Sequence, residues 1–220
     1  MQLLLLQPAD LQSGSRYRVR REIAGEEIVV GVIDGRIGTG RVVARGGDFT
    51  DLDVTLDREP PPPLPLTLIL ALPRPKVLNR VIASAASMGI KRIFLINSWR
   101  VEKSYWKSPK LQHLRDQAIL GLEQARDTVM PQIETRRLFR PFVEGELTSF
   151  EGRKLVAHPH ADRECPRGID EPVTLAIGPE GGFIDEEIAS LKRIGFEAVS
   201  VGPRILRVET AVASIVGRLF

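Results

Sequence analysis

A run of prolines divides this sequence into two parts with different patterns. Five of the seven residues from Glu59 to Pro65 are proline. Consecutive prolines cannot continue a helix or a central strand, and they favour a stiff, extended connection. The sequence therefore predicts one domain in residues 1–58, a linker in residues 59–65 and a second domain in residues 66–220.

The first part carries the signals of short β-strands. Residues 28–30 and 40–43 are short, mostly apolar runs, and residues 51–56 alternate between apolar and polar side chains. Asp34-Gly35 and Gly46-Gly47-Asp48 are typical of tight turns. About 58 residues with this pattern predict a small β-barrel.

Strands alternate with helices in the second part. Such alternation is typical of an α/β domain in which helices cover a mostly parallel sheet. We expect strands at residues 66–71, 92–96, 154–157, 173–177 and 197–201, and helices at 75–88, 109–127, 185–194 and from 209 onward. Asp185 is expected to cap one of these helices and Gly195 to end it.

The composition excludes several classes of site. Cys165 is the one cysteine, so the chain can form neither an internal disulfide nor a cysteine-based metal site, and we expect no metal and a cytoplasmic location. No run approaches the roughly 18 apolar residues of a membrane helix. Residues 1–6 are too short and lack the basic start of a signal peptide, so they are expected to form a strand. A net charge of +3 permits a nucleic-acid partner without requiring one.

Two glycine-containing segments follow predicted strands near the C-terminus. The first, Ile177-Gly178-Pro179-Glu180-Gly181-Gly182-Phe183, lies between a strand and a helix, where parallel sheets bind ligands. It matches neither the Walker pattern nor the dinucleotide pattern. The second, residues 201–211, carries a Gly-Pro turn, an apolar pair and a helix start that offers free backbone donors. The two loops could enclose one ligand, although a glycine turn alone also fits a purely structural loop.

Together these segments resemble the RsmE family. Gly202-Pro203-Arg204-Ile205-Leu206-Arg207-Val208-Glu209-Thr210-Ala211 matches that family in order and in spacing from the first segment. The family consists of SPOUT-class methyltransferases that modify N3 of a uridine in small-subunit ribosomal RNA. The resemblance implies a trefoil-knotted methyltransferase domain, an N-terminal PUA-like barrel that binds RNA, a homodimer, and S-adenosyl-L-methionine (SAM) as cofactor.

The resemblance also implies which residues form the site. Ile205 and Leu206 would flank the adenine ring. The residues expected to contact the cofactor are Ala157, His158, Pro159, Ile177, Gly178, Pro179, Glu180, Gly181, Gly182, Val201, Gly202, Ile205, Leu206, Arg207, Glu209, Thr210 and Ala211. Arg207, Arg204 and Glu180 are the catalytic candidates, the arginines as stabilisers of a uridine anion. The alternatives are that the arginines pair with Glu180 or Glu209, and that Glu180 only holds its loop.

Several basic and aromatic residues are candidates for RNA contact. Arg16, Arg18 and Arg20 alternate and would share one strand face, which is either a phosphate-contacting stripe or a solvated surface. The resemblance adds Arg100, after a strand, and Arg126, near a helix end. Arg136, Arg137 and Arg140 form a further basic stretch. Trp99, Tyr105 and Trp106, with Lys103 and Lys107, either stack on bases or pack a loop.

The sequence also departs from the family pattern. Ser84, Ser87 and Met88 stand where the family carries a lysine followed by Glu-Leu-Gly, and Asp127 stands where it carries an arginine. These positions lie toward the RNA side in the family. The expected reaction is a direct displacement in which uridine N3 of ribosomal RNA or the small ribosomal subunit attacks the SAM methyl and S-adenosylhomocysteine leaves. Methylation of another RNA base, and an RNA-binding or ribosome-assembly module without catalysis, remain the alternatives.

Overall fold

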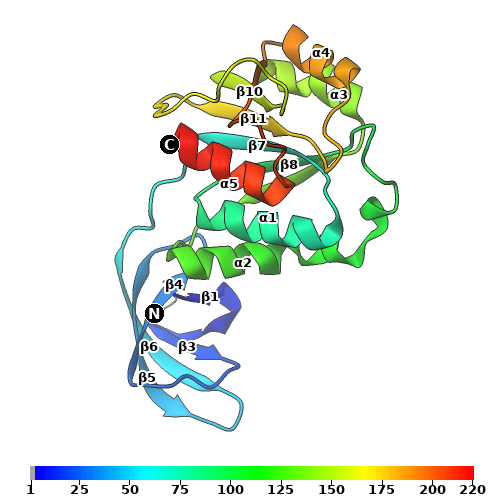
Figure 1. Cartoon of the computed structure of the whole chain (residues 1–220). Helices are drawn as coiled ribbons and strands as arrows, with labels where there is room; N and C mark the ends of the chain where they lie inside the picture. The colour runs from blue at the N-terminus through cyan, green and yellow to red at the C-terminus, as the bar shows by residue number, and fades with distance from the viewer. Residues whose placement is uncertain (1–2) are drawn as a thin grey trace.

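The computed structural model describes residues 3–220 and contains two six-stranded sheets. All strands of the first sheet precede the proline run, and all strands of the second follow it (Figure 1). Residues 1–2 of the strand expected at the N-terminus lie outside the described part of the chain, and the rest of that prediction corresponds to β1 (Leu4–Leu6).

The first sheet has the order β1-β4-β5-β6-β3-β2 and is mainly antiparallel. Its other strands are β2 (Leu11–Ser13), β3 (Arg16–Val19), β4 (Glu27–Val32), β5 (Ile37–Arg45) and β6 (Thr50–Arg58). The turn predicted at Asp34-Gly35 joins β4 to β5, and Asp34 takes the left-handed conformation with φ +57°. Within residues 3–220, β1 and β2 remain the unpaired edges, so backbone hydrogen bonds do not close the sheet into a barrel.

The second sheet is parallel throughout, as the alternating pattern predicts. Its order is β12-β10-β11-β7-β8-β9. The strands are β7 (Leu66–Ala71), β8 (Arg92–Ile96), β9 (Gln132–Arg136), β10 (Arg153–Ala157), β11 (Val173–Ile177) and β12 (Glu197–Val199). The edge strand β9 was not predicted, because its residues form no apolar run.

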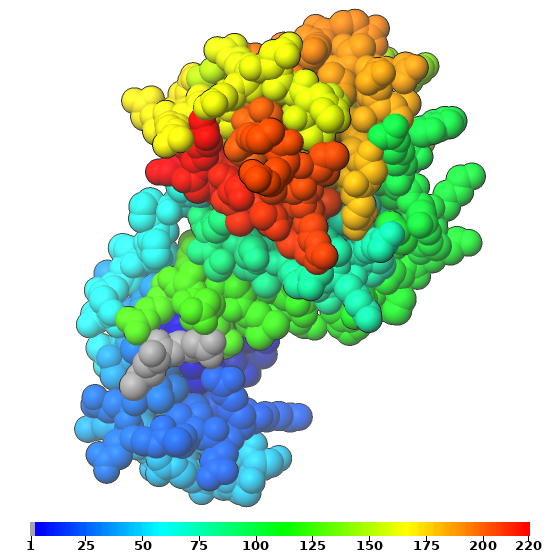
Figure 2. All heavy atoms as spheres, viewed as in Figure 1, coloured from blue at the N-terminus to red at the C-terminus, as the bar shows by residue number. Residues whose placement is uncertain are grey.

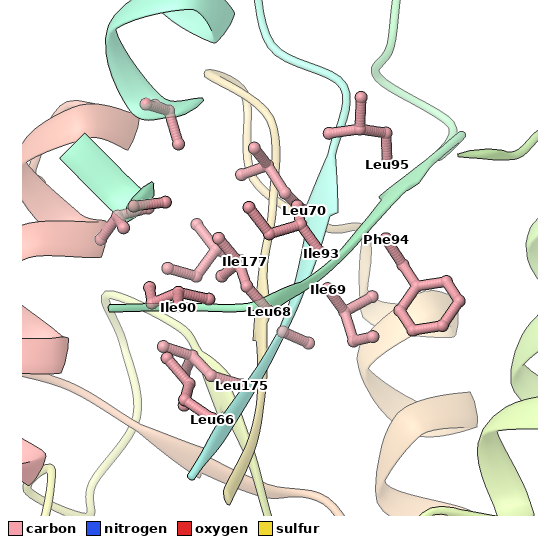
Figure 3. Close-up of a cluster of buried hydrophobic side chains, with 14 of the residues drawn as sticks. Leu66, Leu68, Ile69, Leu70, Ile90, Ile93, Phe94, Leu95, Leu175 and Ile177 are labelled. Atoms are coloured by element: carbon pink, nitrogen blue, oxygen red, sulfur yellow. The ribbon is translucent and has the colours of Figure 1, made fainter. Parts of the chain in front are cut away.

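Helices cover both faces of this sheet. They are α1 (Pro75–Ser87), α2 (Leu114–Ala125), α3 (Phe139–Glu144), α4 (Asp185–Arg193) and α5 (Val208–Leu219). Figure 1 shows α1, α2 and α5 on one side of the sheet and α3 and α4 on the other. The central strands are therefore buried on both faces: in Figure 3, Ile69 and Phe94 point to one side, while Leu68 and Leu70 point to the other.

Two helix starts differ from the sequence prediction. The helix expected from residue 109 begins with a 3₁₀ segment, Pro109–His113, and α2 proper starts at Leu114. The Ser108 side chain accepts a hydrogen bond from the Lys110 amide, which stabilises this tighter first turn. At α4 the capping position is Ile184 and not Asp185. The Ile184 amide donates to the Glu187 carboxylate at 3.1 Å.

The apolar side of α5 faces the core of its own chain. Val212, Ile215, Val216 and Leu219 are each no more than 2% exposed. These four side chains are therefore not available as an apolar surface for a partner. The exposed side of α5 carries small side chains instead, at Thr210, Ala213, Ser214 and Gly217.

Backbone hydrogen bonds join the first sheet to the second domain. The Leu3 amide donates to the Glu123 carbonyl at 3.1 Å, and the Leu5 amide donates to the Glu123 carboxylate at 3.2 Å. The Asp34 amide donates to the Thr128 carbonyl at 2.9 Å. Leu3 and Leu5 also belong to the same hydrophobic cluster as the α/β core. We call this contact between β1, the Asp34 turn and the C-terminal end of α2 the joint.

A buried ion pair stabilises the end of α2. Lys91 Nζ lies 2.6 Å from Asp127 Oδ2 and 2.7 Å from the Val129 carbonyl oxygen. The Asp127 side chain is 4% exposed and that of Lys91 is 14% exposed. Asp127, which stands in place of an arginine in the family pattern, is thus a structural residue.

Replacing Lys91 with methionine is expected to lower the free energy of unfolding by about 3 kcal/mol, because Asp127 is left buried without its counter-charge. Urea unfolding followed by circular dichroism measures this loss. The double variant Lys91→Met, Asp127→Asn is expected to recover much of it. A single variant as stable as the wild type would show that the pair contributes nothing.

Candidate functional site

A cavity of about 250 Å³ lies at the carboxyl ends of β10, β11 and β12, beside the start of α5. Most of the predicted cofactor residues line it. These are Ala157, His158, Pro159, Ile177, Gly178, Pro179, Glu180, Gly181, Gly182, Val201, Gly202, Ile205, Leu206 and Ala211, together with Arg100 and Arg204. Arg207, Glu209 and Thr210 do not line the cavity. The two C-terminal segments therefore meet at one site, as their positions after neighbouring strands predict.

The first segment folds into a tight turn that only glycine suits. The Gly182 amide donates to the Pro179 carbonyl at 2.8 Å, and Gly182 has φ +73°, a conformation that L side chains rarely adopt. Gly178 packs against the end of the same turn. A Cβ added at Gly178 would lie 2.8 Å from the Phe183 backbone nitrogen. The loop shape therefore depends on both glycines.

The second segment forms the outer wall of the cavity. Gly202 has φ +142°, and a Cβ there would meet no atom within 4 Å. Leu206 is partly buried, whereas Ile205 is 72% exposed. Figure 2 shows the segment around residues 201–207, in dark orange, standing out from the surface next to α5. The wall thus offers apolar side chains and open backbone to a flat ligand.

Arg100 connects a third loop to this site. This residue follows β8, and its guanidinium donates a hydrogen bond to the Gly181 carbonyl. A Cβ at Gly181 would lie 2.9 Å from Arg100 Cδ. Arg100, predicted as an RNA contact, therefore also forms part of the cavity wall.

The three catalytic candidates differ in their partners. Glu180 Oε1 accepts a hydrogen bond from the Arg74 amide at 2.9 Å, which ties its loop to the start of α1. Glu209 is paired with Arg80 of α1 at 3.1 Å, and its side chain is 22% exposed. Arg204 and Arg207 are exposed and have no ion-pair partner among residues 3–220. Pairing of these arginines with Glu180 or Glu209 is thus not what the structure shows, and both guanidinium groups can meet an anionic ligand.

His158 lies on the cavity wall without added positive charge. Burial lowers the pKa of its imidazole, and the neighbouring His160 lowers that pKa further. The two rings lie 5.9 Å apart. Both effects favour the uncharged form of the His158 imidazole.

The N-terminal arginine stripe is only partly available to RNA. Arg16 and Arg18 lie on β3, and Arg20 follows the end of the strand. Arg18 donates two hydrogen bonds to Asp51, at 2.7 and 2.8 Å, and its guanidinium lies 4.1 Å from the centre of the Phe49 ring. The hydrogen bond from Arg18 lowers the pKa of the Asp51 carboxyl. Arg16 and Arg20 are exposed.

The basic stretch that begins at Arg136, the last residue of β9, also contains one arginine held by carboxylates and two exposed arginines. Arg136 Nε lies 2.6 Å from Glu146, and its Nη2 lies 2.8 Å from Glu134. The hydrogen bond from Arg136 lowers the pKa of the Glu146 carboxyl. Arg137 and Arg140 are exposed. Arg126, at the end of α2 with φ +55°, is exposed as well but lies outside the cavity wall.

The described residues form neither a metal-binding cluster nor a membrane-spanning helix. Within residues 3–220, no three His, Cys, Asp or Glu side chains gather in an arrangement that could hold a metal ion. In the same part of the chain, no helix has the length and apolar character needed to cross a membrane.

A family model described as an RNA methyltransferase domain matches residues 60–219. The chain belongs to the RNA methyltransferase family. Within this family, the ribosomal RNA small subunit methyltransferase E from Treponema pallidum is 30% identical over 206 residues, which cover 90% of this chain and 77% of that relative. The RsmE resemblance predicted from the two C-terminal segments is therefore confirmed.

Solved structures of methyltransferases share the fold. The ribosomal RNA small subunit methyltransferase E from Neisseria gonorrhoeae, bound to SAM, gives a TM-score of 0.73 at 23% identity, covering 98% of this chain and 95% of that chain. A Legionella pneumophila protein described as a methyltransferase, in complex with SAM, gives a TM-score of 0.71 at 25% identity, with coverage of 97% and 93%.

Some residues that line the cavity were not predicted. They are His160, Phe183, Val199, Ser200, Val208 and Ile215. Phe183 and Val208 lie within the two predicted segments, and the other four lie within two residues of a predicted residue or one helical turn beyond it. Phe183, Val199, Val208 and Ile215 are buried apolar residues, so nothing in their local sequence distinguishes them from other core side chains.

Proposed function

We propose that this chain transfers the methyl group of SAM to N3 of a uridine in small-subunit ribosomal RNA. The observation that carries this proposal is the cavity in which both C-terminal segments meet, in a chain that belongs to the RNA methyltransferase family. The Treponema pallidum relative is named a ribosomal RNA small subunit methyltransferase, and the Legionella pneumophila protein holds SAM.

The cavity suits SAM in chemistry and in size. Its walls are mainly apolar and backbone, which matches an adenosyl group, and small-molecule sites begin at a few hundred Å³, on the order of this volume. The open space beside Gly202 leaves room for a ligand against the backbone. Ile205 and Leu206 would flank the adenine, while Gly178 to Gly182 would hold the ligand by their backbone groups.

The protein would contribute positioning and charge. When bound, SAM would supply a methyl group made electrophilic by its sulfonium: uridine N3 would form a bond to the methyl carbon, the carbon–sulfur bond would break, and S-adenosylhomocysteine would leave with that electron pair. Uridine N3 reacts after it has lost its proton, so Arg207 and Arg204 would stabilise the resulting anion. The walls would hold N3 in line with the methyl group, and the base must be unpaired because a paired N3 is unreachable.

Glu180 is proposed to position its loop and to take no part in proton transfer. Glu180→Gln is expected to keep kcat and SAM affinity within about threefold of wild type, since the amide oxygen still accepts from the Arg74 amide. Glu180→Ala is expected to raise the Kd for SAM roughly tenfold, the effect of one lost hydrogen bond to a charged group. Calorimetry and methyl-transfer kinetics measure the two quantities. A large fall in kcat for Glu180→Gln would instead assign the carboxylate to catalysis.

The N-terminal part is proposed to be a PUA-like RNA-binding domain of residues 1–58, joined by residues 59–65 to a trefoil-knotted domain of residues 66–220. The position of the proline run between the two sheets supports these boundaries. Arg16 and Arg20 would contact phosphates, with Arg18 braced by Asp51, and Arg126 would do so from the end of α2.

We further propose a cytoplasmic homodimer. The exposed small side chains of α5 allow close approach of a second helix, in contrast to the apolar side that the chain buries itself. Light scattering after size-exclusion chromatography is expected to give twice the mass of one chain, and a monomer would contradict the proposal.

Mass spectrometry of the modified nucleotide tests the main proposal. Small subunits and free ribosomal RNA from a strain without this methylation are incubated with the protein and labelled SAM, and N3-methyluridine is the expected product. A methyl group on a different base would support the alternative target. If SAM binds to the protein neither alone nor with RNA, the chain is a non-catalytic RNA-binding or assembly module.

A further inference from the structure

We propose that Trp99 is a stacking platform that holds an unpaired RNA base next to the target uridine. This inference rests on the proposed function, because it assigns a substrate-positioning residue to the same site. It concerns the loop between β8 and α2, which carries Trp99, Arg100, Tyr105 and Trp106.

The three aromatic residues of this loop have different environments. Trp106 donates a hydrogen bond from Nε1 to Asn97 at 2.9 Å and packs against the core. Tyr105 also packs there and donates its hydroxyl hydrogen to Glu102. Trp99, by contrast, is 80% exposed. Packing therefore accounts for two of the aromatic side chains and leaves the largest apolar surface of the loop in solvent.

The backbone that carries Trp99 is held firmly in place. The Trp99 amide donates to Glu187 Oε1 at 2.8 Å, and the other oxygen of this carboxylate accepts from the Ile184 amide. Glu187 is 7% exposed. On the other side, Arg100 binds the Gly181 carbonyl, and the Val101 amide donates to the Ser98 carbonyl at 3.1 Å. Because the backbone at Trp99 is already ordered, binding to its exposed side chain would cost little conformational entropy.

Trp99 is next to the cofactor cavity. Arg100 lines the cavity wall, and adjacent Cα atoms are only about 3.8 Å apart. In Figure 2 the green segment around residues 100–110 borders the amber segment around residue 180 on the same flank of the molecule. A base stacked on the Trp99 indole would thus be a near neighbour of the nucleotide that enters the cavity.

The exposed cations of this loop and of the segment after β9 favour a polyanion, and Glu102, the one carboxylate between residues 97 and 113, accepts a hydrogen bond from Tyr105. Lys103, Lys107 and Arg137 are exposed and have no ion-pair partner among residues 3–220. Arg137 lies over the Trp106 ring at 5.2 Å. Aromatic rings beside unpaired cations are the combination by which proteins bind single-stranded nucleic acid, since every base has a π-face and every linkage a phosphate. We therefore assign this surface to RNA and not to a protein partner.

The presence of only two tryptophans makes the test direct. In a Trp106→Phe background, Trp99 is the sole indole, and a single-stranded uridine-containing RNA fragment is expected to quench its fluorescence. In the matched Trp99→Phe background, the packed Trp106 is expected to respond little to the same fragment. RNA without SAM is used, so that the signal does not depend on methyl transfer.

Kinetics provide the second readout. Trp99→Ala is expected to raise KM for the RNA about tenfold while SAM affinity and kcat change little, and Trp99→Phe, which keeps an aromatic ring, is expected to recover most of the loss. Absence of quenching together with an unchanged KM would overturn the stacking role even if methylation proceeds. If instead no methyl group reaches RNA, the proposed function fails, and quenching of Trp99 by the fragment still decides the stacking proposal.

Discussion

Gly178→Ala is expected to weaken SAM binding by about 100-fold or more, which corresponds to about 2.7 kcal/mol. A Cβ at this position would lie 2.8 Å from the Phe183 backbone nitrogen and 3.1 Å from Gly182, so the turn from Gly178 to Phe183 must open. Opening moves the backbone groups proposed to hold the cofactor. The overpacked turn should also lower stability by about 1–3 kcal/mol. Calorimetry with SAM and thermal unfolding measure the two effects.

Two matched glycine substitutions serve as controls. A Cβ at Gly47 meets no atom within 4 Å, so Gly47→Ala is expected to leave SAM affinity unchanged. Gly181→Ala meets the Arg100 side chain, which can move, so a smaller loss than at Gly178 is expected. Equal affinities for Gly178→Ala and Gly47→Ala would contradict the placement of the cofactor against this turn.

Arg207→Ala is expected to reduce kcat by about 100-fold, the usual effect of removing one donor that stabilises a developing anion. Arg207 has no ion-pair partner within the described residues and lies at the start of α5, next to the cavity wall but not part of it. SAM affinity is therefore expected to change much less than kcat. Single-turnover methylation at saturating SAM separates the two quantities.

Arg204→Ala provides the comparison, since Arg204 is equally exposed but lines the cavity. We expect its removal to affect SAM affinity and kcat together. Arg207→Lys, which keeps the charge but loses the planar donor pair, should retain part of the activity. If Arg207→Ala turned over at the wild-type rate, the anion would have to be stabilised by another group.

The sequence predicted those elements of the fold that a local pattern of apolar residues determines. Mostly apolar runs predicted the buried strands β7, β8 and β11, because both of their faces are covered. The edge strand β9 was not predicted because four of its five residues are polar. The cap of α4 was also misassigned, since the decisive hydrogen bond runs from Ile184 to Glu187, and neither the sequence position nor residue type of Ile184 indicates a cap.

The sequence predicted which loops form the candidate site, but not which of the arginines are paired with carboxylates. Glycine and proline marked the two loops because such turns restrict residue type. By contrast, arginines on the surface look alike in a sequence. Only the structure shows that Arg18 and Arg136 are held by carboxylates, whereas Arg204 and Arg207 are not. Likewise, the exposure of Trp99 depends on how its loop packs, which no local pattern encodes.

The joint between β1, the Asp34 turn and the end of α2 fixes the first sheet relative to the cavity, which matters for a substrate long enough to contact both. Because Glu123 anchors both Leu3 and Leu5, the first sheet cannot swing freely on its proline connection. The arginines of β3 are then kept at a constant separation from the cavity. Under the proposed function, this fixed separation would favour RNA in which a phosphate group and an unpaired base are the matching distance apart, so selection by RNA shape would precede methyl transfer.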